Sequence, residues 1–154
     1  MKFTKIDIGC GKNKEAFFVG IDIYNWKNIY PKGEFICGRI PGVLRKFKSN
    51  SVEEVRAHHF LEHLEQKVVI KTFNEIYRIL KPNGIFKIDV PSTEGKGAFC
   101  DPTHRSWWND WSFRYFDMRW DRELSASYGI KCNFWQEETS ISDDFELHTI
   151  LRKI

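Results

Sequence analysis

The chain has 154 residues, of which 42% are hydrophobic, 16% aromatic and 29% charged, as expected for one globular domain. This aromatic content excludes intrinsic disorder as the main state, because each aromatic side chain offers a large apolar area to bury. With 24 Lys and Arg against 21 Asp and Glu, the net charge of +3 is too small to require a polyanionic partner. We find no repeat or low-complexity linker and expect one continuous domain over residues 1–154.

Short apolar segments alternate with one amphipathic helix along most of the chain. Strands are predicted, in chain order, at residues 3–8, 17–21, 34–37, 52–58 and 86–90. Phe73, Ile76 and Tyr77 share one face of a helix predicted over residues 65–80, which Pro82-Asn83-Gly84 ends. Two further strands, at residues 130–137 and 145–154, are joined by the polar residues 139–144 and form an antiparallel pair.

This order of elements predicts an α/β fold, namely a Rossmann-like open sheet that is mostly parallel and has a C-terminal antiparallel hairpin with one reversed strand. In such sheets ligands bind at the carboxyl ends of the strands, near the point where the strand order reverses. The residues that follow the strands are therefore the first candidates for a functional site.

A glycine turn follows the first strand in the segment Asp7-Ile8-Gly9-Cys10-Gly11. Two glycines let a ligand approach the backbone, and Asp7 stays beside them. Asp22 follows the second strand, where a carboxylate can accept hydrogen bonds from both hydroxyls of a ribose. Lys14 stands where a dinucleotide fingerprint needs its third glycine, so NAD and FAD are disfavoured. The alternative is a structural turn followed by a surface aspartate.

Four segments in this order resemble the landmarks of class I S-adenosylmethionine-dependent methyltransferases. They are Asp7-Ile8-Gly9-Cys10-Gly11, Gly20-Ile21-Asp22-Ile23, Phe60-Leu61-Glu62-His63-Leu64 and Arg78-Ile79-Leu80-Lys81-Pro82-Asn83-Gly84. The resemblance runs from about residue 4 to residue 120 and includes a later Asp101-Pro102-Thr103-His104 segment. It implies a minimal class I methyltransferase fold, S-adenosylmethionine as the cofactor, and methyl transfer to an oxygen or nitrogen nucleophile.

The resemblance also implies the cofactor site. It assigns the amino-acid part of the cofactor to Gly9 and Gly11, next to Asp7, and the ribose to Asp22. The residues after the third and fourth strands complete the expected site: Arg39, Ile40 and His58.

The sequence departs from the family in three places. Arg39 replaces the acid that usually follows the third strand, and the chain begins at its first strand without the usual preceding helix. Only residues 12–16 separate the glycine loop from the second strand, which is too few for a crossover helix.

Two histidines are the catalytic candidates. His59 lies at the carboxyl edge of the sheet, where a neutral imidazole can accept a proton from an attacking hydroxyl or amine; a purely structural role is the alternative. The resemblance places His104, with Arg105 and Trp107, near the acceptor. His59-x-x-Glu62-His63 also matches an inverted zinc-peptidase pattern, so a zinc hydrolase is a competing hypothesis. The pattern straddles a loop rather than lying within a helix, and we therefore expect no metal ligands.

An aromatic segment, residues 104–122, contains four of the six tryptophans interleaved with arginines. Such a mixture can stack on sugars or bases and pair with phosphates. Alternatively, the helical spacing of Trp108, Trp111 and Tyr115 predicts a helix that caps the sheet. We expect a small-molecule or glycan-type acceptor, with nucleic acid as a weaker hypothesis.

Other expectations concern the setting of the protein. The four cysteines are far apart and form no C-x-x-C pair, which favours reduced thiols. The sequence shows no signal-peptide core and no window near the ~18 apolar residues of a membrane span. We therefore expect a cytoplasmic protein with no membrane partner and consider a homodimer. The competing function is a catalytically inactive module that binds S-adenosylmethionine or a partner.

Overall fold

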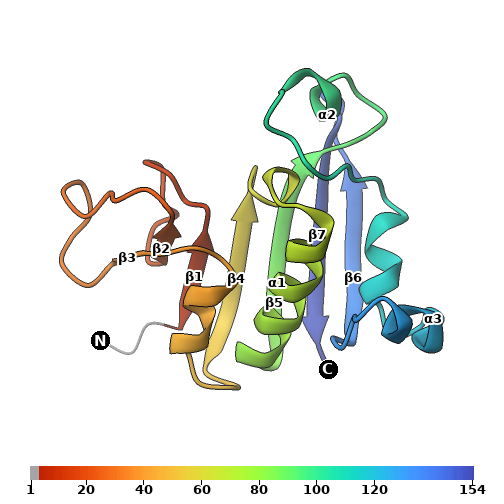
Figure 1. Cartoon of the computed structure of the whole chain (residues 1–154), viewed down its shortest axis with the longest axis horizontal. Helices are drawn as coiled ribbons and strands as arrows, with labels where there is room; N and C mark the ends of the chain where they lie inside the picture. Colours follow the sequence, from red (N-terminus) through yellow and green to blue (C-terminus); the bar gives the residue numbers. More distant parts are fainter. Residues whose placement is uncertain (1–3) are drawn as a thin grey trace.

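The computed structural model describes residues 4–154, which form a seven-stranded sheet with the order β3-β2-β1-β4-β5-β7-β6 (Figure 1). The strands are β1 (Lys5–Ile8), β2 (Val19–Asp22), β3 (Phe35–Cys37), β4 (Val52–His58), β5 (Leu80–Pro91), β6 (Phe134–Ile141) and β7 (Glu146–Lys153). β1 to β5 pair in parallel, and β7 is antiparallel to both of its neighbours. The predicted Rossmann-like α/β fold with one reversed strand is confirmed. The strand order reverses between β1 and β4, where the sequence places the glycine turn.

One long helix covers the centre of the sheet, α1 (Gln66–Ile79), as predicted from its apolar stripe. The ring centroid of its buried Phe73 lies 5.3 Å from that of Phe86 on β5. The remaining helical elements are short: α2 (Gly97–Cys100), α3 (Arg122–Ser127), and the 3-10 turns η1 (Gly42–Lys46), η2 (Leu61–His63) and η3 (Ser112–Phe116).

Two strand predictions are corrected at their ends. Pro82-Asn83-Gly84 lies within β5 instead of in a separate turn, because Leu80 already pairs with Val52 and the pairing shifts register before Glu54. The strand predicted at residues 130–137 is β6 at Phe134–Ile141, so residues 139–141 belong to the strand and not to the link. Residues 131 and 132 stay outside the sheet because their backbone N–H groups donate to Oδ1 of Asn74 on α1. The predicted start of the first strand at Phe3 lies outside the described residues.

The aromatic segment does not form the helix that its spacing suggested. Only η3 and α3 are helical there, and Trp108, Phe113 and Phe116 are buried in the core. The ring of Phe116 stacks on that of Phe73 with a centroid distance of 4.0 Å. The N–H of Thr93 donates to the carbonyl of Trp108, so this part of the segment is attached to the end of β5 as an extended chain. Burial against α1 therefore overrides the helical spacing.

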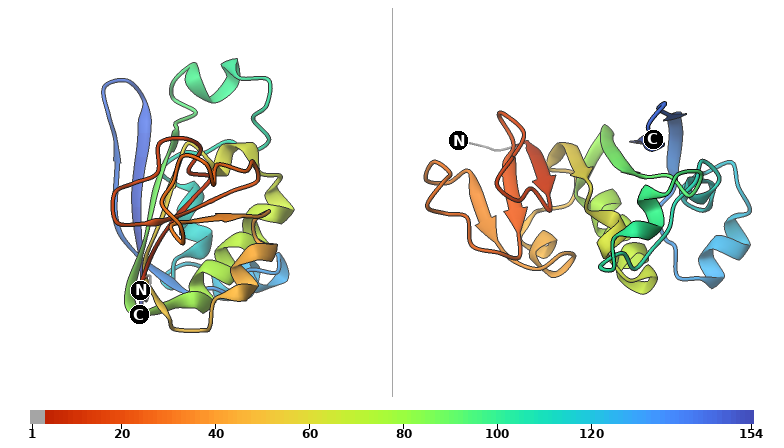
Figure 2. Two further views of the ribbon diagram at one scale, coloured as in Figure 1. Left: turned by 90° about the vertical axis from the view of Figure 1, so that its left-hand side faces the viewer. Right: turned by 90° about the horizontal axis from the view of Figure 1, so that it is seen from above.

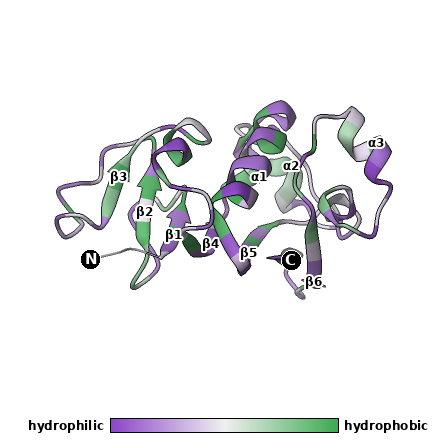
Figure 3. Ribbon diagram, turned by 90° about the horizontal axis from the view of Figure 1, so that it is seen from below, coloured by the Kyte–Doolittle hydropathy of each residue, from purple (hydrophilic) through white to green (hydrophobic). Residues whose placement is uncertain are grey.

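The two faces of the sheet differ in chemistry. α1 and the aromatic segment lie on one side of the sheet (Figure 2), where Val55, Phe86 and Leu151 are fully buried. On the other face Glu54 forms ion pairs with Lys5 at 3.0 Å and with Lys87 at 2.7 Å. Figure 3 shows hydrophilic and hydrophobic residues mixed along the strands of the sheet. One face is thus the core, and the other is a surface of paired charges.

Within residues 4–154, the structure contains no helix with the length and apolar character needed to cross a membrane.

Candidate functional site

The glycine loop and the end of β2 are joined by Asp22. One carboxylate oxygen accepts the N–H of Gly11 at 2.9 Å and the other accepts the N–H of Tyr24 at 2.9 Å. The N–H of Gly9 donates to the carbonyl of Ile21 at 2.8 Å, so the loop is attached to β2 at two points. Each carboxylate oxygen keeps a lone pair beyond these bonds, so Asp22 retains the capacity to accept hydroxyl hydrogen bonds. The structure brings together the predicted residues Gly9, Gly11 and Asp22.

The two predicted glycines have different surroundings. Both adopt left-handed backbone conformations, with φ of 66° at Gly9 and 53° at Gly11. A Cβ atom on Gly9 would lie 2.1 Å from Cδ2 of Phe60, whereas a Cβ on Gly11 would meet nothing within 4 Å. The close approach that Gly9 permits is therefore to Phe60. Gly11 is the glycine whose surroundings are open to a ligand.

The connection from β1 to β2 contains no helix, as its length predicted. The phenol of Tyr30, from the β2–β3 loop, stabilises it by donating to the carbonyl of Gly11 at 2.8 Å and accepting the N–H of Lys14 at 3.0 Å. The ammonium of Lys12 lies 5.0 Å from the ring centroid of Trp26 in the same loop. The β2–β3 loop thus supports the shortened crossover.

Asp7 supports the glycine turn through its buried carboxylate. Its side chain is buried, and Oδ2 accepts the N–H of Glu15 at 2.8 Å and lies 3.4 Å from Nη1 of Arg56. Burial raises the pKa of Asp7, although the Glu15 N–H and Arg56 oppose the shift. These contacts fix the path of the loop, and none of them needs a ligand.

The two candidate residues after β3, Arg39 and Ile40, differ in their exposure to solvent. Arg39 is exposed to solvent at the carboxyl edge, whereas Ile40 is 6% exposed and packs in the core. The carbonyl of Arg39 accepts the N–H of Val43 at the start of η1. Of these two residues, Arg39 is therefore the one that presents a polar side chain to solvent.

His58 belongs to the charged face of the sheet. Its Nδ1 lies 3.2 Å from Oδ2 of Asp89, and Nδ1 of His148 hydrogen-bonds to the other oxygen of the same carboxylate. Burial would raise the pKa of Asp89, but the two histidines outweigh it and lower the pKa below its ordinary value. No described contact links the His58 side chain to the glycine loop, so its predicted cofactor role has no contact to support it.

His59 stands between two carboxylates. It adopts φ of 48°, and its Nδ1 lies 3.3 Å from Oε1 of Glu62 while its Nε2 lies 3.4 Å from Oε2 of Glu146. Glu62 raises the pKa of His59 above its ordinary value, burial opposes this shift, and Glu146 adds to it. Both ring nitrogens of His59 thus face carboxylate oxygens. Its role as a general base stays a prediction.

His104 differs from His59 in its hydrogen bonds. Its Nδ1 lies 2.9 Å from the carbonyl oxygen of Ala98, which can only accept a hydrogen bond, so Nδ1 carries a proton. In the neutral ring the lone pair is then on Nε2, which lies 3.9 Å from Oδ2 of Asp101. The side chain is only 7% exposed. Of the two predicted catalytic histidines, His104 has the geometry of a proton acceptor.

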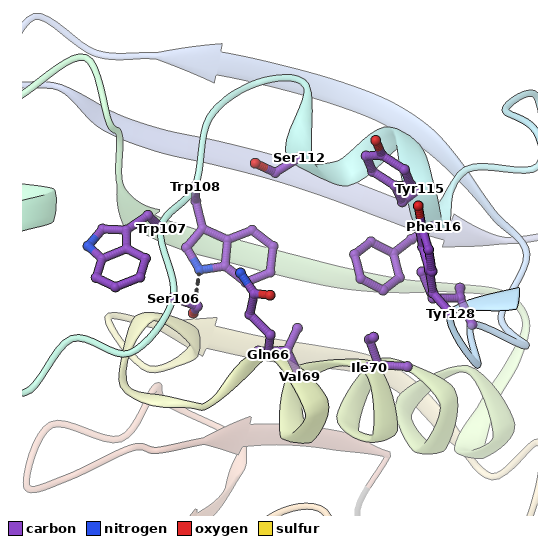
Figure 4. Close-up of a pocket in the computed structure, with 11 residues that line it drawn as sticks. Gln66, Val69, Ile70, Ser106, Trp107, Trp108, Ser112, Tyr115, Phe116 and Tyr128 are labelled. Carbon is purple, nitrogen blue, oxygen red and sulfur yellow. Dashed lines mark hydrogen bonds between the residues drawn. The ribbon is translucent and has the colours of Figure 1, made fainter. Parts of the chain in front are cut away.

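A cavity of about 270 Å³ lies between α1 and the aromatic segment (Figure 4). Its walls are mainly apolar and aromatic and include Val69, Ile70, Trp107, Tyr115 and Tyr128. Trp107 and Ser106 lie at one end of the cavity, and Tyr128 lies at the other. Ser106 donates from its backbone N–H to the carbonyl of Glu62, so that end adjoins the turn after β4. Trp107, which the resemblance places near the acceptor, lines this cavity.

Two residues of the loop region were not identified from the sequence. Phe60 occupies the space beside Gly9, and Tyr30 hydrogen-bonds to the loop from the β2–β3 connection. Phe60 lies within a segment that carries the family resemblance, so the sequence did indicate that this position matters. Tyr30 lies in an irregular loop with no periodicity, and nothing in its sequence context pointed to the glycine turn.

Comparisons with known proteins agree with this geometry. A family model described as a methyltransferase domain matches residues 6–88, which is more than half of the chain. No curated protein sequence matches. The chain therefore belongs to the methyltransferase-domain family, and the resemblance to class I S-adenosylmethionine-dependent methyltransferases is confirmed.

Solved structures share the whole fold at low identity. A SAM-dependent methyltransferase from Archaeoglobus fulgidus has a TM-score of 0.69 and 15% identity, over 99% of this chain and 88% of that one. The 1,6-didemethyltoxoflavin-N1-methyltransferase of Burkholderia thailandensis, solved with S-adenosylhomocysteine, has a TM-score of 0.66 and 15% identity over 97% and 70% of the two chains. A chain solved in complex with the Trm112 methyltransferase activator of Haloferax volcanii has a TM-score of 0.65 and 17% identity over 99% and 83%. These likenesses establish the fold.

Proposed function

We propose that this protein transfers a methyl group from S-adenosylmethionine to an oxygen or nitrogen nucleophile. The observation that carries the proposal is the hydrogen bond from Gly11 to Asp22, which holds an open glycine loop against the carboxylate at the end of β2. This arrangement occurs in a chain that belongs to a methyltransferase family. Methyl transfer breaks the S–CH3 bond and forms a bond from the acceptor to carbon, so the protein contributes mainly alignment.

The residues present fit the cofactor. Gly11 has open space on its Cα, and the Asp22 carboxylate keeps accepting capacity for ribose hydroxyls. We therefore assign the ribose to Asp22 and the amino-acid part to the loop that contains Gly9 and Gly11. Asp7 shapes the loop, and the side chain of Arg39 is available to the adenine end. Ile40 and His58 remain proposed members of the site on the resemblance alone.

For the acceptor we propose a small molecule or glycan that enters the cavity between α1 and the aromatic segment. Its aromatic walls suit a flat or sugar-like ligand, because ring faces stack on such groups. His104 is the proposed proton acceptor, since its Nε2 is free of other hydrogen bonds among the described residues. His59 is retained only as a positioning group for Glu62 and Glu146.

The competing function is a module that binds the cofactor and contacts a partner without catalysis. The exposed Arg39 and the short crossover without a helix between β1 and β2 favour it, and a protein of the same fold is known in complex with a methyltransferase activator. We propose that any such contact, or a homodimer, uses an edge of the sheet. We also propose a single domain in a reducing, cytoplasmic setting, because all four cysteines are free.

A turnover assay distinguishes the methyltransferase from the binding module. The protein is incubated with S-adenosylmethionine and panels of hydroxyl- and amine-bearing metabolites, sugars and short oligonucleotides, and released S-adenosylhomocysteine is measured. Acceptor-dependent release that is lost in Asp22→Ala supports methyl transfer. Binding of S-adenosylhomocysteine without turnover on any panel favours the binding module.

A further inference from the structure

Three side chains that can bind a metal ion converge at the carboxyl edge of the sheet. Glu62 and His63 belong to η2, directly after β4, and His104 comes from the loop after α2. One carboxylate oxygen and one nitrogen of each imidazole all lie within 4.8 Å of one another. The rings of His63 and His104 meet edge to face, with centroids 5.0 Å apart. Ligand atoms around tetrahedral Zn²⁺ are about 3.4 Å apart, so a small closure of these side chains encloses an ion.

Hydrogen bonds determine which nitrogen each histidine presents. The hydroxyl of Thr103 donates to Oδ1 of Asp101 at 2.7 Å, so it can only accept from Nδ1 of His63, 3.0 Å away. Nδ1 of His104 donates to the carbonyl of Ala98. Both rings therefore carry a proton on Nδ1 and a lone pair on Nε2. This pattern, in which the far nitrogen donates to an oxygen acceptor, is typical of histidines that bind metal ions.

The buried carboxylate of Glu62 is the strongest indication that this cluster binds a cation. Its residue is 1% exposed, and neither carboxylate oxygen accepts a hydrogen bond from any group within residues 4–154. The imidazole of His59 lies 3.3 Å from Oε1 of Glu62 and 3.4 Å from Oε2 of Glu146. A single imidazole is thus shared by two carboxylates. A buried carboxylate without a hydrogen bond is unfavourable unless a cation compensates it.

We infer that Glu62, Nε2 of His63 and Nε2 of His104 bind a divalent transition-metal ion, with Zn²⁺ the best match to one carboxylate and two imidazoles. This donor set leaves a fourth position for water or another oxygen ligand. These ligands differ from the His59 and His63 pair that the sequence pattern suggested. A metal site also departs from the expectation that the chain has no metal ligands. The ligand that replaces His59 is His104, which no local pattern could connect to Glu62.

The site has a consequence for the acceptor, and this consequence rests on the proposed function. In the open fourth position, a bound ion would hold an oxygen of the acceptor and lower the pKa of a hydroxyl there, so the inference favours an oxygen nucleophile. The hydroxyl proton passes to solvent, the S–CH3 bond breaks, an O–CH3 bond forms, and S-adenosylhomocysteine leaves. His104 then acts as a metal ligand instead of a base.

Metal binding is tested directly, without an activity assay. The full chain is stripped with a chelator, equilibrated with Zn²⁺ or Co²⁺, and examined by calorimetry, metal analysis and the visible spectrum of Co²⁺. We expect one ion per chain and intense visible absorption from low-coordinate Co²⁺. Glu62→Gln, His63→Ala and His104→Ala are expected to weaken Zn²⁺ binding by more than about 100-fold, and Thr103→Val by about 10-fold, because outer hydrogen bonds matter less than ligands.

Matched controls address folding and ligand identity. His148→Ala removes an imidazole from the charged face and is expected to bind Zn²⁺ as the unaltered chain does. Glu62→Gln removes a buried carboxylate that accepts no hydrogen bond from the described residues, so the metal-free variant should melt no lower than the metal-free parent. Zn²⁺ should raise the melting temperature of the parent but not that of Glu62→Gln. The inference is overturned if the parent retains no Zn²⁺, if the three ligand variants bind normally, or if His59→Gln loses the ion while His104→Ala keeps it.

The proposed metal site and the proposed methyl-donor site are contradicted by different results. Zn²⁺ binding without S-adenosylhomocysteine binding would leave the metal site in place and contradict the proposed donor. S-adenosylhomocysteine binding without Zn²⁺ binding would contradict the metal site alone.

Discussion

The backbone of Gly9 lies directly against the ring of Phe60, so closely that a Cβ atom on Gly9 would be 2.1 Å from Cδ2 of the ring. The turn after β1 and the turn after β4 are therefore packed against each other at the point where the strand order reverses. Gly11, two residues later, has no such neighbour.

The first prediction contrasts the two glycines. Gly11→Ala adds only the strain of a left-handed backbone, about 1–2 kcal/mol. Gly9→Ala adds the same strain and a clash, for a total of about 2–5 kcal/mol. Chemical denaturation measures both values. In the background of Phe60→Ala, which removes the ring but keeps the Cβ at 2.8 Å, the cost of Gly9→Ala should fall part of the way towards that of Gly11→Ala. Equal costs of the two glycine variants in the parent would show that the contact is unimportant.

The second prediction concerns Asp117, which is 3% exposed and attaches the aromatic segment to β6. Its carboxylate accepts from Nε and Nη2 of Arg119 and from the N–H of Gln136. Burial would raise the pKa of Asp117, but these bonds outweigh it and hold the pKa below its ordinary value of 3.8. A lowered pKa gives stability that is present above pH 3.8 and is lost as the pH falls through the folded-state value.

Asp117→Asn is therefore expected to cost about 1.5–3 kcal/mol of unfolding free energy at pH 7. The difference from the parent should shrink as the pH falls below the ordinary pKa of Asp117. Urea denaturation at a series of pH values measures it. A difference that stays constant down to pH 2 would argue against the ionised carboxylate as the source.

The third prediction separates two adjacent tryptophans. Trp108 is 4% exposed and its Nε1–H donates to Oγ of Ser106, whereas Trp107 is 49% exposed at the cavity. Trp108→Ala should lower the unfolding free energy by about 3–5 kcal/mol. Trp107→Ala should leave it within about 0.5 kcal/mol of the parent but weaken acceptor binding. Trp135 on β6, whose ring lies 4.0 Å from the guanidinium of Arg119, is a control for acceptor binding alone. Equal acceptor affinities for the Trp107 and Trp135 variants would remove Trp107 from the pocket.

Much of the fold was predictable because apolar patterns report burial. The alternation of Phe86, Ile88 and Val90 with Lys87 and Asp89 located β5, and it also encodes the two unlike faces of the sheet. The helical stripe around Phe73 located α1 to within one residue at each end. The aromatic segment could not be predicted in this way, since Trp108 and Phe116 are buried by contact with Phe73 and not by helical periodicity.

The candidate site could be predicted from the sequence only where its residues lie at the ends of adjacent strands. Gly9, Gly11 and Asp22 follow adjacent strands, and the topology brings them together. His104 meets Glu62 and His63 through a long connection after β5, and the lack of hydrogen bonds to Glu62 depends on burial. Sequence spacing carries no information on either property, which is why the histidine pattern suggested His59 as the partner.

The most direct test of the account is a calorimetric titration of the chain with S-adenosylhomocysteine, compared with Asp22→Asn. Asparagine keeps one oxygen for the loop but loses the charge, which is worth about 1.5–3 kcal/mol, or about 10- to 150-fold in affinity. Asp143→Asn, which changes an exposed residue of the β6–β7 turn, is the control. The account predicts saturable binding that is weakened in this range by Asp22→Asn and unchanged by Asp143→Asn. No heat of binding and no thermal shift at millimolar ligand, or equal affinity in both variants, would contradict the proposed donor site.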